Sequence, residues 1–139
     1  MPEKGAGFLV DSNVLLDIIT RDPSWHDWSA NALAEAARSS SVWINPLIFA
    51  EVSVSFAHVD DLEAALPASI LKRAPLPYAA GFLAGKAFLA YRRRGGSRHT
   101  PMPDFYIGAH AVVNGLTLIT RDAQRYRSYF PTLKLVSPH

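Results

Sequence analysis

Two patterns of apolar residues alternate along the chain: short continuous runs, and longer stretches in which apolar residues recur every three or four positions. The first pattern is typical of buried strands and the second of helices with one buried face. Because strands and helices alternate, the sequence predicts a three-layer α/β sandwich with a central parallel sheet. The predicted strands cover 8–10, 42–44, 116–119 and 133–136, and the predicted helices cover 14–19, 24–38, 47–58, 60–73, 78–94 and 104–114.

Serine, proline and glycine set several of the predicted boundaries. Ser24 is expected to cap the second helix, and Pro46 suits the first turn of the third. Pro67 is expected to interrupt or kink the helix predicted over 60–73. The stretch 97–103 reads as an extended basic loop between two helices.

The composition narrows the class of protein. The chain has 139 residues, of which 49% are hydrophobic and 19% charged, and this excludes disordered, collagen-like and low-complexity proteins. It has no cysteine, which excludes disulfides, thiolate zinc sites and cysteine nucleophiles. No apolar run approaches the ~18 residues of a membrane span. We therefore expect one cytoplasmic domain over residues 1–139, with no membrane segment.

Charge is distributed unevenly between the two halves. Residues 1–70 hold three basic and ten acidic side chains, whereas residues 71–139 hold eleven basic and two acidic ones. Either a basic face for a polyanion or ordinary uneven surface charge explains this difference. Four arginines stand close together before Asp104, and we favour a role in binding RNA phosphates, because they exceed what a helix C-terminus needs. They are Arg92, Arg93, Arg94 and Arg98.

Acidic residues follow two of the predicted strands directly. Asp11 comes after the strand 8–10, and Asp122 stands close behind the strand 116–119. In open α/β sheets the functional site lies beyond the carboxyl ends of the strands, so both carboxylates are expected along one edge. Taken singly, each acid has an ordinary explanation. Asp11 and Asp104 could cap helices, Asp122 could cap a turn over 123–126, and Glu51 could lie on the solvent face of its helix.

Together the acids suggest a chemistry. Hydrolysis of a phosphodiester without a cysteine or an obvious catalytic triad calls for hard divalent cations, which prefer carboxylate oxygens and water. Three or four acids from distant segments of a chain are what such a site requires. Two of these acids lie near helix N-termini, which would also favour the binding of a phosphate group.

Four motifs carry a resemblance to a known family. They are Asp11-Ser12-Asn13 after an apolar strand, Glu51 in an apolar helix, Asp104-x-x-Ile107-x-Ala109, and Thr120-Arg121-Asp122 after a strand. In order and approximate spacing they resemble the PIN domain, over essentially the whole chain. The chain is most similar to the VapC-type toxins of VapBC toxin–antitoxin pairs.

The resemblance implies a Mg²⁺- or Mn²⁺-dependent endoribonuclease that leaves a 3′-hydroxyl and a 5′-phosphate. It also implies an RNA substrate, a VapB-type antitoxin and a homodimer. By the same resemblance, Asp11 and Asp104 would bind the metal directly, and Glu51 and Asp122 would act through water or on a second ion. Asn13 would orient the first carboxylate, and Thr120 would position the attacking water.

Two other functions remain open. A catalytically silent PIN-like module could bind RNA or protein as a scaffold, although the intact set of acids favours the enzyme. A metal-dependent phosphatase is a more distant alternative, because Asp11-Ser12-Asn13 lacks the second Asp of the Asp-x-Asp signature of haloacid-dehalogenase phosphatases.

The three tryptophans, Trp25, Trp28 and Trp43, are expected in core packing or under a partner peptide rather than stacked on bases. The acidic first half and the helix with Trp25 and Trp28 would suit an amphipathic antitoxin peptide, whose basic residue could reach Asp11, Glu51 or Asp104.

Overall fold

A parallel five-stranded sheet with the order β3-β2-β1-β4-β5 forms the centre of the computed structural model, which describes residues 7–95 and 102–139. Each neighbouring pair of strands is parallel. The strands are β1 (Phe8–Val10), β2 (Val42–Ile44), β3 (Leu71–Arg73), β4 (Thr117–Ile119) and β5 (Leu135–Val136).

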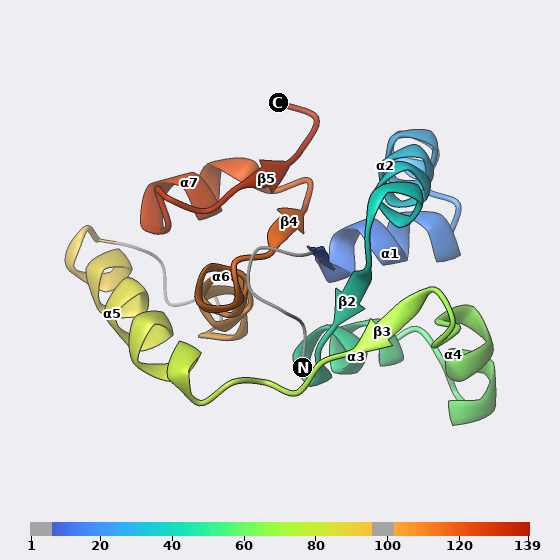
Figure 1. Ribbon diagram of the computed structural model, residues 1–139, viewed down its shortest axis with the longest axis horizontal. Coiled ribbons are helices and arrows are strands. Elements are labelled where there is room, and N and C mark those ends of the chain that lie inside the picture. Colours follow the sequence, from blue (N-terminus) through green and yellow to red (C-terminus); the bar gives the residue numbers. More distant parts are fainter. Residues whose placement is uncertain (1–6, 96–101) are drawn as a thin grey trace.

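Helices cover both faces of this sheet. Helices α1 and α2 lie on one side of it, and α5, α6 and α7 lie on the other (Figure 1). The three-layer α/β/α architecture predicted from the sequence is therefore confirmed. The helices are α1 (Ser12–Ile19), α2 (His26–Ser39), α3 (Pro46–Ser53), α4 (Val59–Ala65), α5 (Ala79–Arg93), α6 (Met102–Asn114) and α7 (Ala123–Tyr129).

The order of the strands places two strand ends side by side. From the central β1 the chain adds β2 and β3 on one side, then crosses to β4 and β5 on the other. The strand order reverses at this point, where open α/β sheets form their sites. Val10 pairs with Ile119, and the backbone N–H of Asp11 donates to the carbonyl of Ile119 at 2.9 Å. The residues that follow β1 and β4 therefore emerge together.

The predicted interruption near Pro67 is confirmed, but the continuation of that helix to residue 73 is wrong, because the chain forms the strand β3 there. Helix α4 ends at Ala65, two residues before Pro67, which lacks the N–H needed to continue a helix. Leu71 is buried while Lys72 and Arg73 are exposed, so a single apolar residue marks this edge strand. The preceding helix, predicted to extend to His58, ends at Ser53.

Other boundaries shift by a few residues. Helix α2 begins at His26 rather than after a Ser24 cap, because the Asp22 carboxylate accepts the backbone N–H groups of Ser24 and Trp25. The predicted strands at 116–119 and 133–136 shorten to β4 and β5. The predicted loop at 97–103 falls mostly outside the described residues, and its last two residues begin α6.

Two of the three tryptophans show the core packing that was one of the two predicted roles. Trp28 and Trp43 are partly buried against the hydrophobic core. Trp25 meets Trp28 edge-on, with ring centroids 6.5 Å apart. Trp25 and Trp28 each stay partly exposed, and a partner peptide that covers them stays a prediction.

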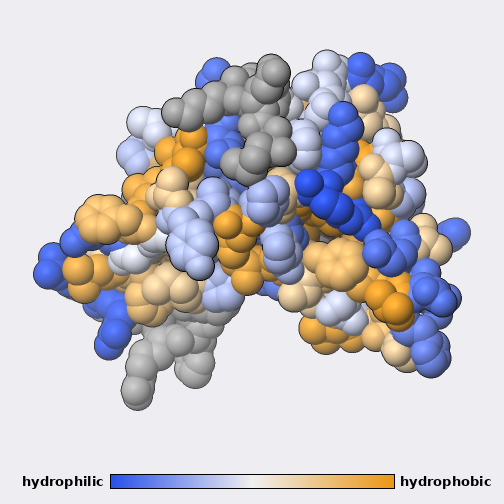
Figure 2. Space-filling view, turned by 60° about the horizontal axis from the view of Figure 1, so that its bottom comes forward, coloured by the Kyte–Doolittle hydropathy of each residue, from blue (hydrophilic) through white to orange (hydrophobic). Residues whose placement is uncertain are grey.

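Exposed apolar side chains lie elsewhere. Tyr78 and Phe82 at the start of α5 are 98% and 75% exposed, and Val54 and Val59 between α3 and α4 are 86% and 63% exposed. Figure 2 shows apolar surface towards both sides of one face of the molecule. None of the described helices is long and apolar enough to span a bilayer.

A buried histidine joins α6 to the end of β2. His110 is fully buried, and its Nδ1 lies 3.0 Å from Nδ2 of Asn45. Because that amide nitrogen can only donate, Nδ1 accepts and the imidazole is neutral with its proton on Nε2. Burial lowers the pKa of His110 from 6.5 to about 4. The ring therefore resists protonation in the folded protein.

We expect His110 to make the protein less stable in mild acid. As pH falls from 6.5 towards 4, His110 takes up a proton in the unfolded chain but not in the folded one. The free energy of unfolding should therefore fall over this range, by about 3 kcal/mol at most for a group with such a shift. Urea unfolding of the wild type and of His110→Gln should show that the substitution removes this loss. An NMR titration in which the ring of His110 protonates near its ordinary pKa would contradict the assignment.

Candidate functional site

Asp11 stands at the junction of β1 and α1, with its carboxylate surrounded by donors. It is 5% exposed and is the N-cap residue of α1, with Oδ1 accepting the backbone N–H of Ser12 at 2.9 Å. Its Oδ2 accepts from the hydroxyl of Thr120 at 2.9 Å and from that of Tyr126 at 3.0 Å. Both oxygens are thus held in place by residues from three elements of the fold.

Asn13 and Thr120 connect the beginning of α1 to the end of β4. Asn13 Nδ2 lies 3.5 Å from Oδ2 of Asp11 and 3.4 Å from Oγ1 of Thr120. Asn13 Oδ1 accepts the backbone N–H of Arg121 at 3.3 Å, and Thr120 Oγ1 accepts that of Asp122 at 3.0 Å. The hydroxyl proton of Thr120 is directed at Asp11, so the structure makes Thr120 a neighbour that orients this carboxylate.

Glu51 approaches the site from α3. Its Oε1 accepts the hydroxyl of Ser12 at 2.9 Å, and the residue is half-buried. The sequence allowed Glu51 to lie on a solvent face, and this interpretation is wrong because the side chain turns towards the beginning of α1. The sequence motif assigned no role to Ser12, but in the structure this residue links Asp11 to Glu51.

Arg125 joins the other two acids. Its Nη1 lies 2.6 Å from Oδ2 of Asp104, and its Nη2 lies 3.3 Å from Oδ2 of Asp122. Asp104 lies within the first turn of α6 rather than ahead of it, and the Asp122 side chain makes no capping hydrogen bond to α7. The capping interpretation is therefore wrong for both acids. Their carboxylates pair with the guanidinium of Arg125 instead.

Burial and mutual repulsion make these acids harder to ionise. Burial raises the pKa of Asp11 to about 6, against the opposing hydrogen bonds from Thr120 and Tyr126. Burial also raises the pKa of Glu51 and of Asp104, and neighbouring carboxylates add to both shifts. For Asp104 the nearby Arg125 guanidinium opposes the rise. The site therefore concentrates negative charge that a bound cation would stabilise.

The four acids have the right kind of ligand atoms for a hard cation, but their side chains do not converge on one point. All four acids offer carboxylate oxygens, the ligands that Mg²⁺ and Mn²⁺ prefer. Within residues 7–95 and 102–139, no three acidic or histidine side chains converge closely enough to form a ready-made metal site. Two of the acids are turned towards Arg125, which supplies positive charge in the place of a metal.

Sequence reasoning missed Arg125 and Tyr126. A signal for Arg125 existed, because Asp122 and Arg125 are three residues apart in a predicted turn and such pairs face each other on a helix. Nothing in the sequence linked Tyr126 to Asp11, which lies 115 positions away.

The arginines singled out in the sequence lie at the end of α5. Arg92 and Arg94 are exposed, and their guanidinium groups lie 5.9 Å and 5.1 Å from the rings of Phe88 and Tyr129. Arg93 is also exposed and lines a shallow pocket of about 380 Å³. Arg98 lies outside the described residues. A role for these arginines in binding RNA stays a prediction.

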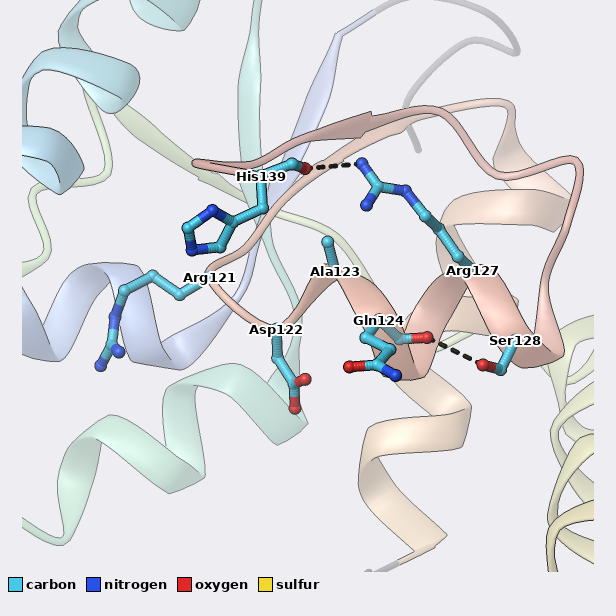
Figure 3. A pocket seen from close by; sticks show the side chains of 7 residues that line it. All are labelled: Arg121, Asp122, Ala123, Gln124, Arg127, Ser128 and His139. Atoms are coloured by element: carbon cyan, nitrogen blue, oxygen red, sulfur yellow. Dashed lines mark hydrogen bonds between the residues drawn. The ribbon is translucent and has the colours of Figure 1, made fainter.

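A larger pocket of about 600 Å³ opens beside Asp122, between α7 and the end of the chain (Figure 3). In this view Asp122 points away from Arg127, whose Nη2 donates to the carbonyl oxygen of His139 at 2.8 Å. Arg121, on the same rim, pairs with the buried Asp17 through Nε at 2.6 Å. Two neighbouring arginines of this pocket thus have partners away from the acidic site.

Comparison with known families decides which protein class this is. A model of the PIN domain matches residues 8–130. The chain belongs to the PIN-domain family. No curated protein sequence matches this PIN domain.

Solved structures of VapBC proteins and of FitAcB share its fold. VapBC2 from Rickettsia felis, bound to a DNA fragment from its promoter, matches with a TM-score of 0.71 and 19% identity, over 94% of this chain and 97% of that one. VapBC-1 from nontypeable Haemophilus influenzae matches with a TM-score of 0.71 and 14% identity, over 94% and 96%. FitAcB from Neisseria gonorrhoeae matches with a TM-score of 0.66 and 17% identity, over 94% and 97%.

Divalent cations should stabilise this PIN domain at neutral pH. Because the pKa of Asp11 is raised to about 6, ionisation of its carboxylate at neutral pH makes the folded protein less stable. A bound cation would offset that loss. At about 100 times its Kd, Mn²⁺ should raise the melting temperature by roughly 5–10 °C. The increase should shrink in mild acid, where a proton competes for the site.

Differential scanning fluorimetry with matched variants checks this expectation. Asp11→Asn and Asp104→Asn should lose most of the increase, whereas Glu35→Gln, which removes an exposed carboxylate from α2, should keep it. A melting temperature that saturating Mn²⁺ leaves unchanged at neutral pH would show that the acids do not act as one cation site.

Proposed function

We propose that this PIN domain is a Mg²⁺- or Mn²⁺-dependent endoribonuclease and the toxin of a VapBC-type toxin–antitoxin pair. One observation carries the proposal: carboxylates from four separate segments of the chain lie near enough to repel one another, and burial raises the pKa of the three most buried ones, Asp11, Glu51 and Asp104. Titratable groups with such shifts are typical of functional sites.

The residues have distinct proposed roles. Asp11 and Asp104 would hold the metal directly, and Glu51 and Asp122 would contribute through water or a second ion. When bound, a divalent cation supplies Lewis acidity at the scissile phosphate and lowers the pKa of a bound water. Asn13, Thr120 and Tyr126 orient the Asp11 carboxylate, and Ser12 orients Glu51. These contacts fix the ligand oxygens before any cation arrives.

Its partner would be a VapB-type antitoxin. The matched structures named VapBC are complexes, and their shared fold supports a similar assembly for this chain. The pairing of Arg125 with Asp104 and Asp122 supports one detail, because it shows that a guanidinium fits among the acids. A basic side chain of the antitoxin could bind there in the same way. A homodimer is part of the same proposal.

A second candidate function is a catalytically silent module that binds RNA or protein. The observation in its favour is that Arg125 already neutralises two of the acids, while no three described acids converge on one point. Cleavage assays separate the two candidates, since a silent module would bind RNA without cutting it.

RNA cleavage should depend on both the metal and the acids. We expect Asp11→Asn and Asp104→Asn to reduce cleavage of single-stranded RNA by more than about a hundredfold, because each removes a ligand charge. Chelation of the metal should stop RNA cleavage by the wild type, and added Mg²⁺ or Mn²⁺ should restore cleavage. Glu35→Gln serves as the control and should cleave normally. Cleavage that persists without metal, or in Asp104→Asn, would refute the metal-dependent mechanism and favour a different chemistry.

Binding of the antitoxin should be sensitive to the charge at Glu51. We expect Glu51→Lys to weaken the complex with a cognate antitoxin by about tenfold or more, because a like charge would face the basic side chain. Glu35→Lys, an exposed change on α2, is the matched control for net charge. Affinity measured by surface plasmon resonance on folded variants gives the answer. Equal affinities for both variants would place the antitoxin away from the acidic site.

A further inference from the structure

Arg125 occupies a position that neither the sequence motifs nor the proposed mechanism explain. It projects from α7 and bridges Asp104 of α6 and Asp122, which precedes α7, through different nitrogens of one guanidinium. Its side chain is 34% exposed, so the group also faces solvent. Among the described residues it is the one basic side chain that forms an ion pair with any of the four acids.

A divalent cation and Arg125 require the same oxygens. Oδ2 of Asp104 lies 2.6 Å from Arg125, a short charge-assisted contact, and such an oxygen cannot serve both cations at full strength. Positive charges that share a ligand also repel each other. Metal binding at these acids must therefore weaken the hold on Arg125.

A released Arg125 would remain beside the acids as an exposed cation. RNA phosphates are repelled by a cluster of carboxylates, so a substrate needs positive charge at this edge. The planar guanidinium presents several N–H donors in a geometry that matches phosphate oxygens, which a lysine ammonium does not. The neighbouring Arg121 and Arg127 are held by Asp17 and by the carbonyl of His139. Arg125 is thus the group best placed to bind a phosphate at the acids.

We propose that Arg125 exchanges partners, binding Asp104 and Asp122 in the metal-free protein and a phosphate oxygen of the RNA once these carboxylates act as metal ligands. This inference rests on the proposed function. It has a thermodynamic consequence: metal and RNA bind with positive coupling, because each favours the state in which Arg125 has left the acids.

Binding measurements on Arg125→Gln test the first half of the exchange without any cleavage. Mn²⁺ titrations of metal-free protein, followed by electron paramagnetic resonance of the free ion, should show about three- to fivefold tighter binding than in the wild type, because a competing cation is gone. Arg127→Gln is the matched control, since it removes an arginine of the same helix whose side chain contacts the chain end (Figure 3). Its Mn²⁺ affinity should equal that of the wild type.

The second half concerns RNA. With Ca²⁺ in place of Mn²⁺, Arg125→Gln should bind a mixed-sequence single-stranded RNA about tenfold more weakly than the wild type, the size of one charge-assisted contact. Arg127→Gln should lose much less. Arg125→Lys keeps the charge and should recover part of the affinity but not all of it. Circular dichroism checks that each variant folds, and Arg125→Met, which is also uncharged, replaces Arg125→Gln in both measurements if the latter does not.

Each outcome decides between distinct conclusions. Unchanged or weaker Mn²⁺ binding by Arg125→Gln would overturn the exchange, because Arg125 would then support the metal rather than compete with it. Tighter Mn²⁺ binding with unchanged RNA binding would overturn the phosphate contact. If the wild type binds Mn²⁺ and cleaves RNA, and Arg125→Gln binds Mn²⁺ and RNA as the wild type does, the exchange of Arg125 would be refuted while the proposed function would stand. A wild type that binds no Mn²⁺ would refute the proposed function and the inference with it.

Discussion

The carboxylate of Asp11 is buried at the end of the central strand, where the direction of strand addition reverses. Removing such a charge from water is unfavourable unless donors replace the lost solvent. Here the backbone of α1, the hydroxyl of Thr120 after β4 and the hydroxyl of Tyr126 on α7 provide those donors. The Asp11 carboxylate therefore connects three parts of the fold, namely the beginning of α1, the end of β4 and helix α7.

A comparison with Asp17 shows why Asp11 is more than a structural residue. Asp17 is as buried, but it accepts two hydrogen bonds from Arg121 and one from Ser29, so its charge has a complete set of partners. Among the described residues Asp11 has neutral donors and no basic partner, and the negative charge of Asp104 acts against it. Buried charge without a counter-ion is expected where a ligand brings the counter-ion.

Apolar periodicity predicted the layers and most elements, because strands such as Val42–Ile44 are buried on both faces and leave an unbroken apolar run. It missed β3, since an edge strand with Lys72 and Arg73 exposed carries almost no apolar signal. The acids at strand ends were predictable from topology, whereas the partners of Asp104 and Asp122 were not. A long flexible side chain such as Arg125 reaches across helices, and only the folded chain shows which acids it meets.

We propose that the four carboxylates around the ends of β1 and β4 form one cation site, and that Arg125 balances two of them in the metal-free protein. Anomalous diffraction from crystals soaked in Mn²⁺ tests it most directly, because it locates the ion and the side chains together. We expect a manganese peak ligated by Asp11 and Asp104, with Arg125 moved away from Asp104. Well-ordered crystals with no peak at these acids at saturating Mn²⁺, and with Arg125 still bridging Asp104 and Asp122, would contradict it.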